Sequence, residues 1–218
     1  MTRFARIAYT PSVRAAQEEN GSALAARRQL GPTGGRTDDP DPLGPDEAAF
    51  LAETDGFYLA SVGDTGWPYV QYRGGPPGFL HVLDPGTLAF TDVRGNRQYI
   101  TTGNARNDDR VALFVMNYAA RARLKLYGRM TVRGLDEDPA LTQTLAEPRT
   151  DGRPERHLVI AVEGWNWNCP QHITPRFSER EVSAALAPVR ERMRLLEEEN
   201  EDLRARLERY MERAEAAG

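Results

Sequence analysis

The sequence predicts a mostly β, α+β fold, with a small antiparallel barrel, flanking helices and a long C-terminal heptad helix. Between residues 57 and 164, short segments of alternating polarity are separated by Gly, Pro and Asp turns, which is typical of antiparallel strands. Between residues 182 and 214, apolar residues recur by fours and threes, which is typical of a heptad helix. Few helical segments separate the strands, and this disfavours a doubly wound parallel sheet.

The residues that precede the barrel predict helices and a linker. Residues 11–30 have a helical pattern that is interrupted at Asn20-Gly21. Residues 31–46 are rich in Gly, Pro and Asp and almost lack apolar residues, so they predict a loop or linker. Pro45 opens a short helix, which runs from Ala48 to Thr54.

The barrel is predicted to contain about six or seven strands. Its first hairpin joins residues 57–62 to residues 67–73 through the turn at residues 63–66. Further strands are expected at residues 79–83, 87–91, 110–116, 124–133 and 157–164. Short helical pieces are expected within residues 94–107 and 139–146.

The tail has one apolar seam. Its positions are Val182, Leu186, Val189, Met193, Leu196, Asn200, Leu203, Leu207, Tyr210 and Ala214. Dense Arg and Glu elsewhere favour a narrow seam for a partner helix over a helix packed on its own domain. Asn200 in the seam would fix the register at some cost in stability, but the pattern leaves parallel and antiparallel pairing open. We therefore divide the chain into a helical segment and linker (1–45), a barrel (46–178) and a coiled-coil-like helix (179–218).

Composition excludes several classes of protein. The 218 residues carry a net charge of −4, whereas a general nucleic-acid binder usually has a basic excess. No apolar run approaches the roughly twenty residues of a membrane span, and the N-terminus lacks the apolar stretch of a signal peptide. The single cysteine, Cys169, cannot form an internal disulfide. These features predict a cytoplasmic protein that contacts neither nucleic acid nor membrane.

Several familiar sites are missing from the sequence. It has no P-loop, no GxGxxG after a strand and no HExxH, and its three histidines lack metal-ligand spacing, so no metal site is expected. Cys169 and His172 offer a thiol and an imidazole three residues apart. We favour the interpretation that Cys169 is a buried thiol and His172 a structural histidine. The alternative is a cysteine nucleophile with His172 as its base.

Polar residues gather where predicted strands end. Arg73 precedes the Gly74-Gly75 break, which would let backbone approach a flat ring. Thr91 and Asp92 end a later strand, and the predicted helix then opens with Arg94, Asn96, Arg97 and Gln98. Backbone N–H groups and Arg or Asn side chains at a helix start suit a phosphate, although a polar surface loop would have the same composition.

Positive charge concentrates on one predicted strand face. That face holds Arg121, Arg123, Lys125, Tyr127, Arg129, Thr131 and Arg133, and Lys125 is the only lysine of the chain. Such a face needs carboxylates or a ligand phosphate, or it is solvated. After the last strand come Trp165, Asn166, Trp167, Asn168 and Gln171, which suit either the rim of an aromatic ligand or a turn that closes the core.

Together these segments resemble the pyridoxamine 5′-phosphate oxidase-like FMN-binding split-barrel family. The resemblance is carried by Asp64 to Phe79, Leu88 to Asp92 and Arg94 to Tyr99, and it covers about residues 46–178. Asp109 to Phe114, Leu124 to Arg129 and Cys169 to Ile173 fit the same pattern.

The resemblance implies a split β-barrel homodimer with FMN at the subunit interface. Thr91, Asn96 and Arg97, with Asp92 and Gln98 beside them, match the family's phosphate-binding stretch. Gln71, Tyr72 and Arg73 match the strand along the isoalloxazine ring. Lys125 would reach the ring or the phosphate, and Trp167 and Gln171 would come from the second subunit.

The resemblance also implies a function, an FMN-dependent oxidoreductase that acts on an unidentified small molecule. The flavin would carry the chemistry, so no catalytic residue is assigned; Tyr72 and His172 are candidates for proton transfer. Pyridoxamine phosphate is not expected as the substrate, because the heptad helix replaces the family's usual C-terminal residues. Alternatives are a non-enzymatic flavin-binding or sensor protein and a deazaflavin-dependent reductase, and some relatives bind haem.

Overall fold

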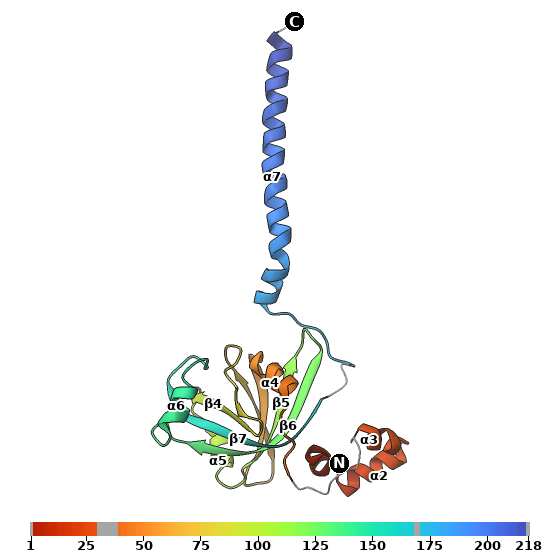
Figure 1. Ribbon diagram of the computed structural model, residues 1–218, viewed down its shortest axis with the longest axis vertical. Helices are drawn as coiled ribbons and strands as arrows, with labels where there is room; N and C mark the ends of the chain where they lie inside the picture. The colour runs from red at the N-terminus through yellow and green to blue at the C-terminus, as the bar shows by residue number, and fades with distance from the viewer. Residues whose placement is uncertain (1, 30–38, 168–170, 217–218) are drawn as a thin grey trace. The chain divides into compact units, whose positions relative to one another are not determined.

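The computed structural model describes residues 2–29, 39–167 and 171–216, in two compact units divided between Thr174 and Pro175 (Figure 1). The first unit contains the sheet and the shorter helices. The second contains the long helix α7 (Glu179–Ala216). Cys169 and Asn168, which the sequence marks as candidates, lie outside the described residues.

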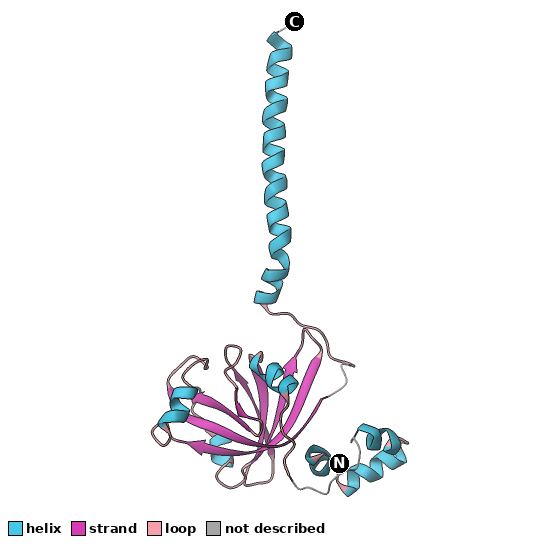
Figure 2. Cartoon of the chain, viewed as in Figure 1, coloured by secondary structure: helices cyan, strands magenta, loops and turns pink. Residues whose placement is uncertain are grey.

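The first unit is built on one seven-stranded antiparallel sheet (Figure 2). Its strands are β1 (Gly56–Val62), β2 (Pro68–Gly74), β3 (His81–Asp84), β4 (Thr87–Val93), β5 (Arg110–Asn117), β6 (Ala122–Arg133) and β7 (Pro154–Trp167), in the order β2-β1-β5-β6-β7-β4-β3. The predicted mostly β fold is confirmed. Strand β3 begins later than expected, because Phe79 and Leu80 turn into the core before the ladder starts.

Side chains bridge the gap between β2 and β4, the split of the barrel, where the two sides of the sheet approach each other without pairing. Arg73 on β2 and Asp92 on β4 form an ion pair of 2.7 Å, although four strands separate β2 from β4 in the sheet order. The sheet is therefore rolled, and a salt bridge joins its ends where no backbone ladder does. Inside the roll, aromatic rings of Phe57, Phe79 and Phe90 contact one another with centroids 5.4–6.4 Å apart.

Helix α4 (Pro45–Ala52) confirms the predicted helix start. Pro45 takes the first helical position, where its missing N–H is harmless. The Gly44 N–H donates to Glu47 Oε2 at 2.9 Å, so the side chain caps the helix. In the N-terminal segment, α2 (Pro11–Glu19) and α3 (Ala23–Gln29) are separated at Asn20-Gly21, as the sequence predicts.

Helix α1 (Arg3–Ala8) is not foreseen by the sequence analysis. Phe4 is buried and stacks on Tyr127 of β6, and the two Asp41 carboxylate oxygens accept from the N–H groups of Arg3 and Phe4 at 2.9 Å. A Cβ on Gly164 would overlap the Phe4 backbone, so this close approach needs a glycine. Six residues are too few for a helix without such tertiary contacts.

Carboxylates pair with two arginines of the charged face of β6, while Lys125 and Arg123 lie over the rings of Phe4 and Phe114. Arg129 binds Asp109 at 2.8 Å and Glu163 at 2.9 Å, and Arg133 lies 3.7 Å from Asp138. Arg121 is not on this face, because it precedes the strand with a left-handed φ of 54°. The expectation that Arg121 shares the face is therefore wrong.

Helix α7 is continuous over 38 residues, or about 57 Å at 1.5 Å per residue. None of its residues is buried. None of the described helices combines the length and the apolar character needed to cross a membrane.

His157 ties β7 to β4 and to α6 (Pro139–Thr144). Its buried ring contacts the Thr91 hydroxyl through Nδ1 at 3.2 Å and the Thr142 hydroxyl through Nε2 at 2.8 Å. Burial lowers the pKa of His157, and Asp138 only partly opposes that effect. The folded protein therefore favours the neutral ring more than the unfolded chain does.

The His157 contacts predict a pH-dependent stability. Because the folded pKa lies below the unfolded value of about 6.5, stability is complete above that pH and is lost as the pH falls through it toward the folded pKa. We expect the urea midpoint to fall between pH 7.5 and pH 5.5, and to fall less in His157→Gln. An equal fall in both proteins would contradict this assignment.

Candidate functional site

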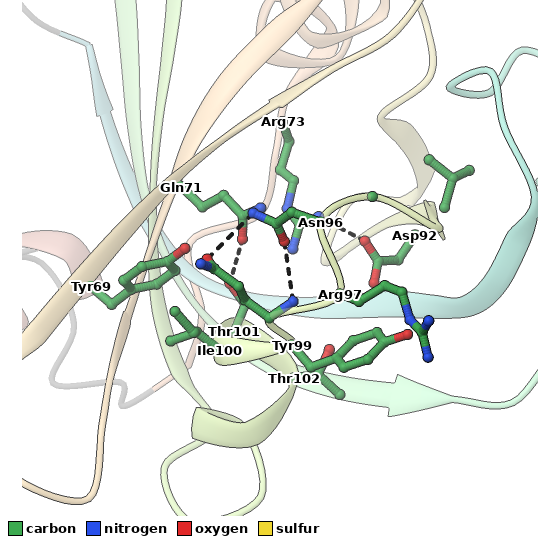
Figure 3. A pocket seen from close by; sticks show the side chains of 13 residues that line it. Tyr69, Gln71, Arg73, Asp92, Asn96, Arg97, Tyr99, Ile100, Thr101 and Thr102 are labelled. Carbon is green, nitrogen blue, oxygen red and sulfur yellow. Dashed lines mark hydrogen bonds and ion pairs between the residues drawn. The ribbon is translucent and has the colours of Figure 1, made fainter.

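A pocket of about 160 Å³ lies in the split of the barrel, between β2 and the segment that follows β4. Figure 3 shows side chains from these two parts of the chain on its walls. The lining residues are Tyr69, Gln71, Arg73, Asp92, Val93, Gly95, Asn96, Arg97, Gln98, Tyr99, Ile100, Thr101 and Thr102. Residues far apart in sequence thus meet here because the sheet is rolled.

Strand β2 supplies alternate residues to the pocket. Tyr69, Gln71 and Arg73 are partly buried, whereas Val70 and Tyr72 between them are exposed. Gln71 is held by the Thr101 hydroxyl, which donates to its Oε1 at 3.2 Å. No described residue accepts from the Gln71 Nε2, so the fixed amide retains a donor for a bound group.

Arg73 and Asp92 form the charged floor of the pocket. Their side chains are 16% and 8% exposed, so the pair is shielded from solvent. Arg156 approaches the second Asp92 oxygen at 3.8 Å and donates to the Thr102 hydroxyl at 3.1 Å. The Arg73 Nε is buried and has no hydrogen-bond partner in the described part of the chain. This nitrogen is a buried, unsatisfied donor, as is the Arg123 Nε on β6.

The opposite wall is the loop of residues 94–99. The Asn96 Oδ1 accepts from the Gln98 N–H at 3.1 Å, which closes an Asx turn. Arg97 and Tyr99 have left-handed φ values of 62° and 54°. Such values cost roughly 1–3 kcal/mol in non-glycine residues, and they occur preferentially where a ligand is held.

These left-handed residues also correct the predicted helix. Helix α5 (Ile100–Asn104) begins after the loop, not at Arg94, because a right-handed helix cannot include Arg97 and Tyr99 in these conformations. Among the described residues, nothing accepts from the backbone N–H groups of Gly95, Asn96 and Arg97. The loop itself, and not a helix terminus, therefore presents these donors.

Tyr99 is held against the charged network behind the pocket. Its ring lies 4.7 Å from the Arg156 guanidinium carbon, and its hydroxyl donates to Glu155 Oε1 at 3.3 Å. Arg94 binds the same Glu155 oxygen at 2.7 Å, and this hydrogen bond, with that of Tyr99, keeps the pKa of Glu155 below its usual value. Glu155 thus stays ionised and anchors both ends of the loop.

The arrangement suits a polar, anionic ligand. Its walls carry amide, guanidinium and backbone donors, and the Asp92 charge is already engaged by Arg73 and Arg156. The unused donors on Gln71 and the loop fit a phosphate together with the acceptor edge of a ring system. On this test the residues present suit the phosphate group of a cofactor.

Two predicted residues lie away from this pocket. Thr91 is buried on the other face of β4, where its hydroxyl donates to the Leu145 carbonyl at 3.3 Å. Tyr72 points to the outer face of β2 and meets Tyr58 edge-on at 5.5 Å. Partial burial, then Asp55 and Tyr58, raises the pKa of Tyr72, which favours the neutral phenol. Strand alternation explains both positions, because neighbours of Arg73 and Asp92 must face the other way.

The other predicted residues are also placed elsewhere. Lys125 lies over the Phe4 ring at 5.5 Å, and burial followed by Arg123 lowers its pKa. Trp167 donates to Glu47 Oε1 at 2.6 Å, which fits a core-closing turn. Gln171 lies exposed in a turn, and so does His172 with a φ of 64°. The assignment of Trp167 and Gln171 to a second subunit remains a prediction, as does a proton-transfer role for His172.

The glycines of the Gly74-Gly75 break leave room for aromatic side chains of the protein itself. A Cβ at Gly74 would lie 2.9 Å from Tyr72, and one at Gly75 would lie 2.6 Å from Phe79. The space that the sequence assigned to a flat ligand ring is therefore occupied by side chains of the chain itself.

Sequence reasoning missed Tyr69, Tyr99, Thr101 and Arg156. Tyr69 carried a signal, because it stands two residues before Gln71 on the same strand face. Arg156 reaches the site because β7 pairs with β4, where it lies opposite Asp92, and Tyr99 packs on Arg156. Thr101 reaches Gln71 because the rolled sheet brings β2 near the segment that follows β4. In residues 2–29, 39–167 and 171–216, no three His, Cys, Asp or Glu side chains are grouped as around a metal ion.

The chain was compared with known proteins. Residues 43–166, more than half of the chain, match the family model described as pyridoxamine 5′-phosphate oxidase. No curated protein matches. Among solved structures, HupZ of Group A Streptococcus has 12% identity, covers 62% of this chain and 99% of its own, and gives a TM-score of 0.47.

Two further solved structures are similar to this chain. A Clostridium acetobutylicum protein, described as related to general stress protein 26 of the pyridoxinephosphate oxidase family, has 13% identity, covers 63% and 94% of the two chains, and gives a TM-score of 0.44. An F420 reductase has 18% identity, covers 54% and 94%, and gives a TM-score of 0.40. From the family-model match and the rolled antiparallel sheet, we conclude that the chain belongs to the pyridoxamine 5′-phosphate oxidase family.

Proposed function

We propose that the barrel binds FMN in the pocket between β2 and the loop of residues 94–99, and that the protein is an oxidoreductase acting on a small molecule. The observation that carries this proposal is the Gln71 amide in the pocket wall, beside the Arg73–Asp92 ion pair. Its oxygen accepts from Thr101, and its nitrogen has no acceptor among the described residues. An amide held in a pocket with its donor unused suits a ligand with acceptors.

Each residue then has a defined part. Arg97 and the backbone N–H groups of residues 95–97 hold the phosphate, and Asn96 and Gln98 keep the loop in shape. Gln71 and Arg73 donate to the acceptor edge of the ring. When bound, FMN supplies the electron-transfer chemistry, while this chain's residues bind it, orient it and keep its phosphate neutralised.

We further propose that a second copy of the chain completes the site. Ligand pockets usually measure about 300–1,000 Å³, and this one measures about 160 Å³. The outer face of the edge strand β2 is apolar, with Val70 58% and Tyr72 57% exposed. A homodimer formed through this face would cover these side chains and would place the second copy along β2, whose opposite face lines the pocket.

The proposal is tested by the absorption spectrum of the purified protein after FMN addition and gel filtration. We expect retained flavin bands that are released on denaturation, and weaker retention of deazaflavin F420 under the same conditions. Because the pocket supplies the donors, Gln71→Leu should weaken retention while the far-UV circular dichroism stays unchanged. Retention of F420 but not FMN would instead support the deazaflavin reductase.

The exposed seam of α7 favours a second candidate, a flavin-binding sensor that signals through its helix. The two candidates differ in turnover. An oxidoreductase oxidises a reductant such as NADPH catalytically when an electron acceptor is present, whereas a sensor is reduced once and stops. Stopped-flow absorption of the FMN-loaded protein measures the difference.

A further inference from the structure

Helix α7 carries an apolar seam that no described residue covers. Leu203 is 53% exposed, Leu207 60% and Tyr210 76%. Exposed leucines at regular seam spacing are typical of a helix that pairs with another helix. What remains open is which helix pairs with it, and in which direction.

The charges beside the seam fit a parallel pair. With Leu186, Met193, Asn200 and Leu207 at heptad position a, the e positions include Glu197 and Arg204, and the g positions include Arg192 and Glu199. In a parallel, in-register pair, each g residue faces the e residue five positions later in the other helix. Arg192 would then face Glu197 of the second copy, and Glu199 would face Arg204 of the second copy. Both contacts are attractive.

Within the helix these charges remain available. The ion pairs of Arg194 with Glu191 and Glu198 occupy the b and f positions, away from the seam. In the described helix, none of Arg192, Glu197, Glu199 and Arg204 forms an ion pair with another residue. Pro188 falls at position c, so the hydrogen bond that it removes also lies outside the seam.

Asn200 distinguishes parallel from antiparallel pairing. Parallel, in-register pairing places Asn200 against Asn200 of the second copy, where the two amides can hydrogen-bond. Antiparallel pairing places an a residue opposite a d residue, and every described d residue from Val182 to Tyr210 is apolar or aromatic. Asn200 would then be buried against an apolar partner such as Leu196 or Leu203, which is unfavourable.

We propose that α7 forms a parallel, in-register two-stranded coiled coil with α7 of a second copy of this chain. The proposal goes beyond flavin binding and does not depend on it. The C-terminal helix is then a dimerisation element, and parallel pairing places the C-terminal ends of the two helices side by side.

The test is disulfide formation in the full chain with one cysteine added at a time. Leu207→Cys places a thiol at a seam position. Parallel, in-register pairing brings this thiol next to the thiol at position 207 of the second chain. Glu198→Cys places a thiol at position f as the matched control, and both variants share the background of Cys169. In a glutathione redox buffer, Leu207→Cys should form the covalent dimer about tenfold faster than Glu198→Cys. Equal rates would overturn the proposal.

A charge exchange tests the direction separately. Arg192→Glu, added to Leu207→Cys, should slow cross-linking several-fold, because it faces Glu197 of the second copy with a like charge. Adding Glu197→Arg should restore the rate. Residues 192 and 197 are five apart and do not meet on one helix, so rescue requires two parallel chains. Failure of the second substitution to restore the rate would overturn the parallel register.

Discussion

Substituting Asp92 with asparagine is expected to lower the free energy of unfolding by about 3 kcal/mol. Asp92 is 8% exposed and engages Arg73 at 2.7 Å across the split of the barrel, with Arg156 at 3.8 Å on its other oxygen. Asparagine keeps the shape but leaves a buried guanidinium without its countercharge. The substitution also removes a link between β2 and β4 across the sheet, so we expect the proposed flavin site to weaken with it.

Urea unfolding followed by circular dichroism measures this effect, and Asp109→Asn is the matched control. Asp109 pairs with Arg129 at 2.8 Å, but the two side chains are 45% and 51% exposed. The same chemical change there should cost less than about 1 kcal/mol, because solvent screens the pair. If the two variants were equally stable, the Arg73–Asp92 pair would not hold the barrel closed.

The strands could be predicted from the sequence because their signal is local. Alternating polarity between Gly and Pro turns fixes each strand, as at Trp67 to Arg73, where the observed strand begins at Pro68. Helix α1 could not be predicted in this way. Its six residues are stabilised by Tyr127, Glu163 and Asp41, which are distant in sequence.

The candidate site was predictable only in part for the same reason. The sequence identifies Gln71, Arg73, Asp92, Asn96, Arg97 and Gln98, all of which line the pocket. The family resemblance also points to Thr91 and Tyr72, but strand alternation turns each of them to the opposite face. Arg156 lies opposite Asp92 in the β4–β7 pair and Tyr99 packs on Arg156, so both enter the network through a pairing of strands that are distant in sequence.

Replacing Arg97 with glycine is expected to affect binding and stability in opposite directions. Loss of the guanidinium should raise the dissociation constant for FMN by roughly 10- to 100-fold, since a charge-assisted hydrogen bond contributes about 1.5–3 kcal/mol. The free energy of unfolding should rise by up to about 1 kcal/mol, because glycine adopts the φ of 62° without strain. Flavin fluorescence quenching and urea unfolding without FMN measure the two quantities.

Two variants separate the causes. Arg97→Ala removes the same guanidinium but keeps a Cβ in the left-handed conformation, so it should lose FMN affinity without the gain in stability. Arg110→Ala removes an exposed arginine that binds Asp108 outside the pocket, and it should change neither quantity much. The strained backbone at position 97 is explained if the Arg97 guanidinium binds the phosphate, which glycine cannot do. If Arg97→Gly were more stable and bound FMN as tightly as Arg110→Ala does, the strain would serve no ligand, and the phosphate would have to be held elsewhere.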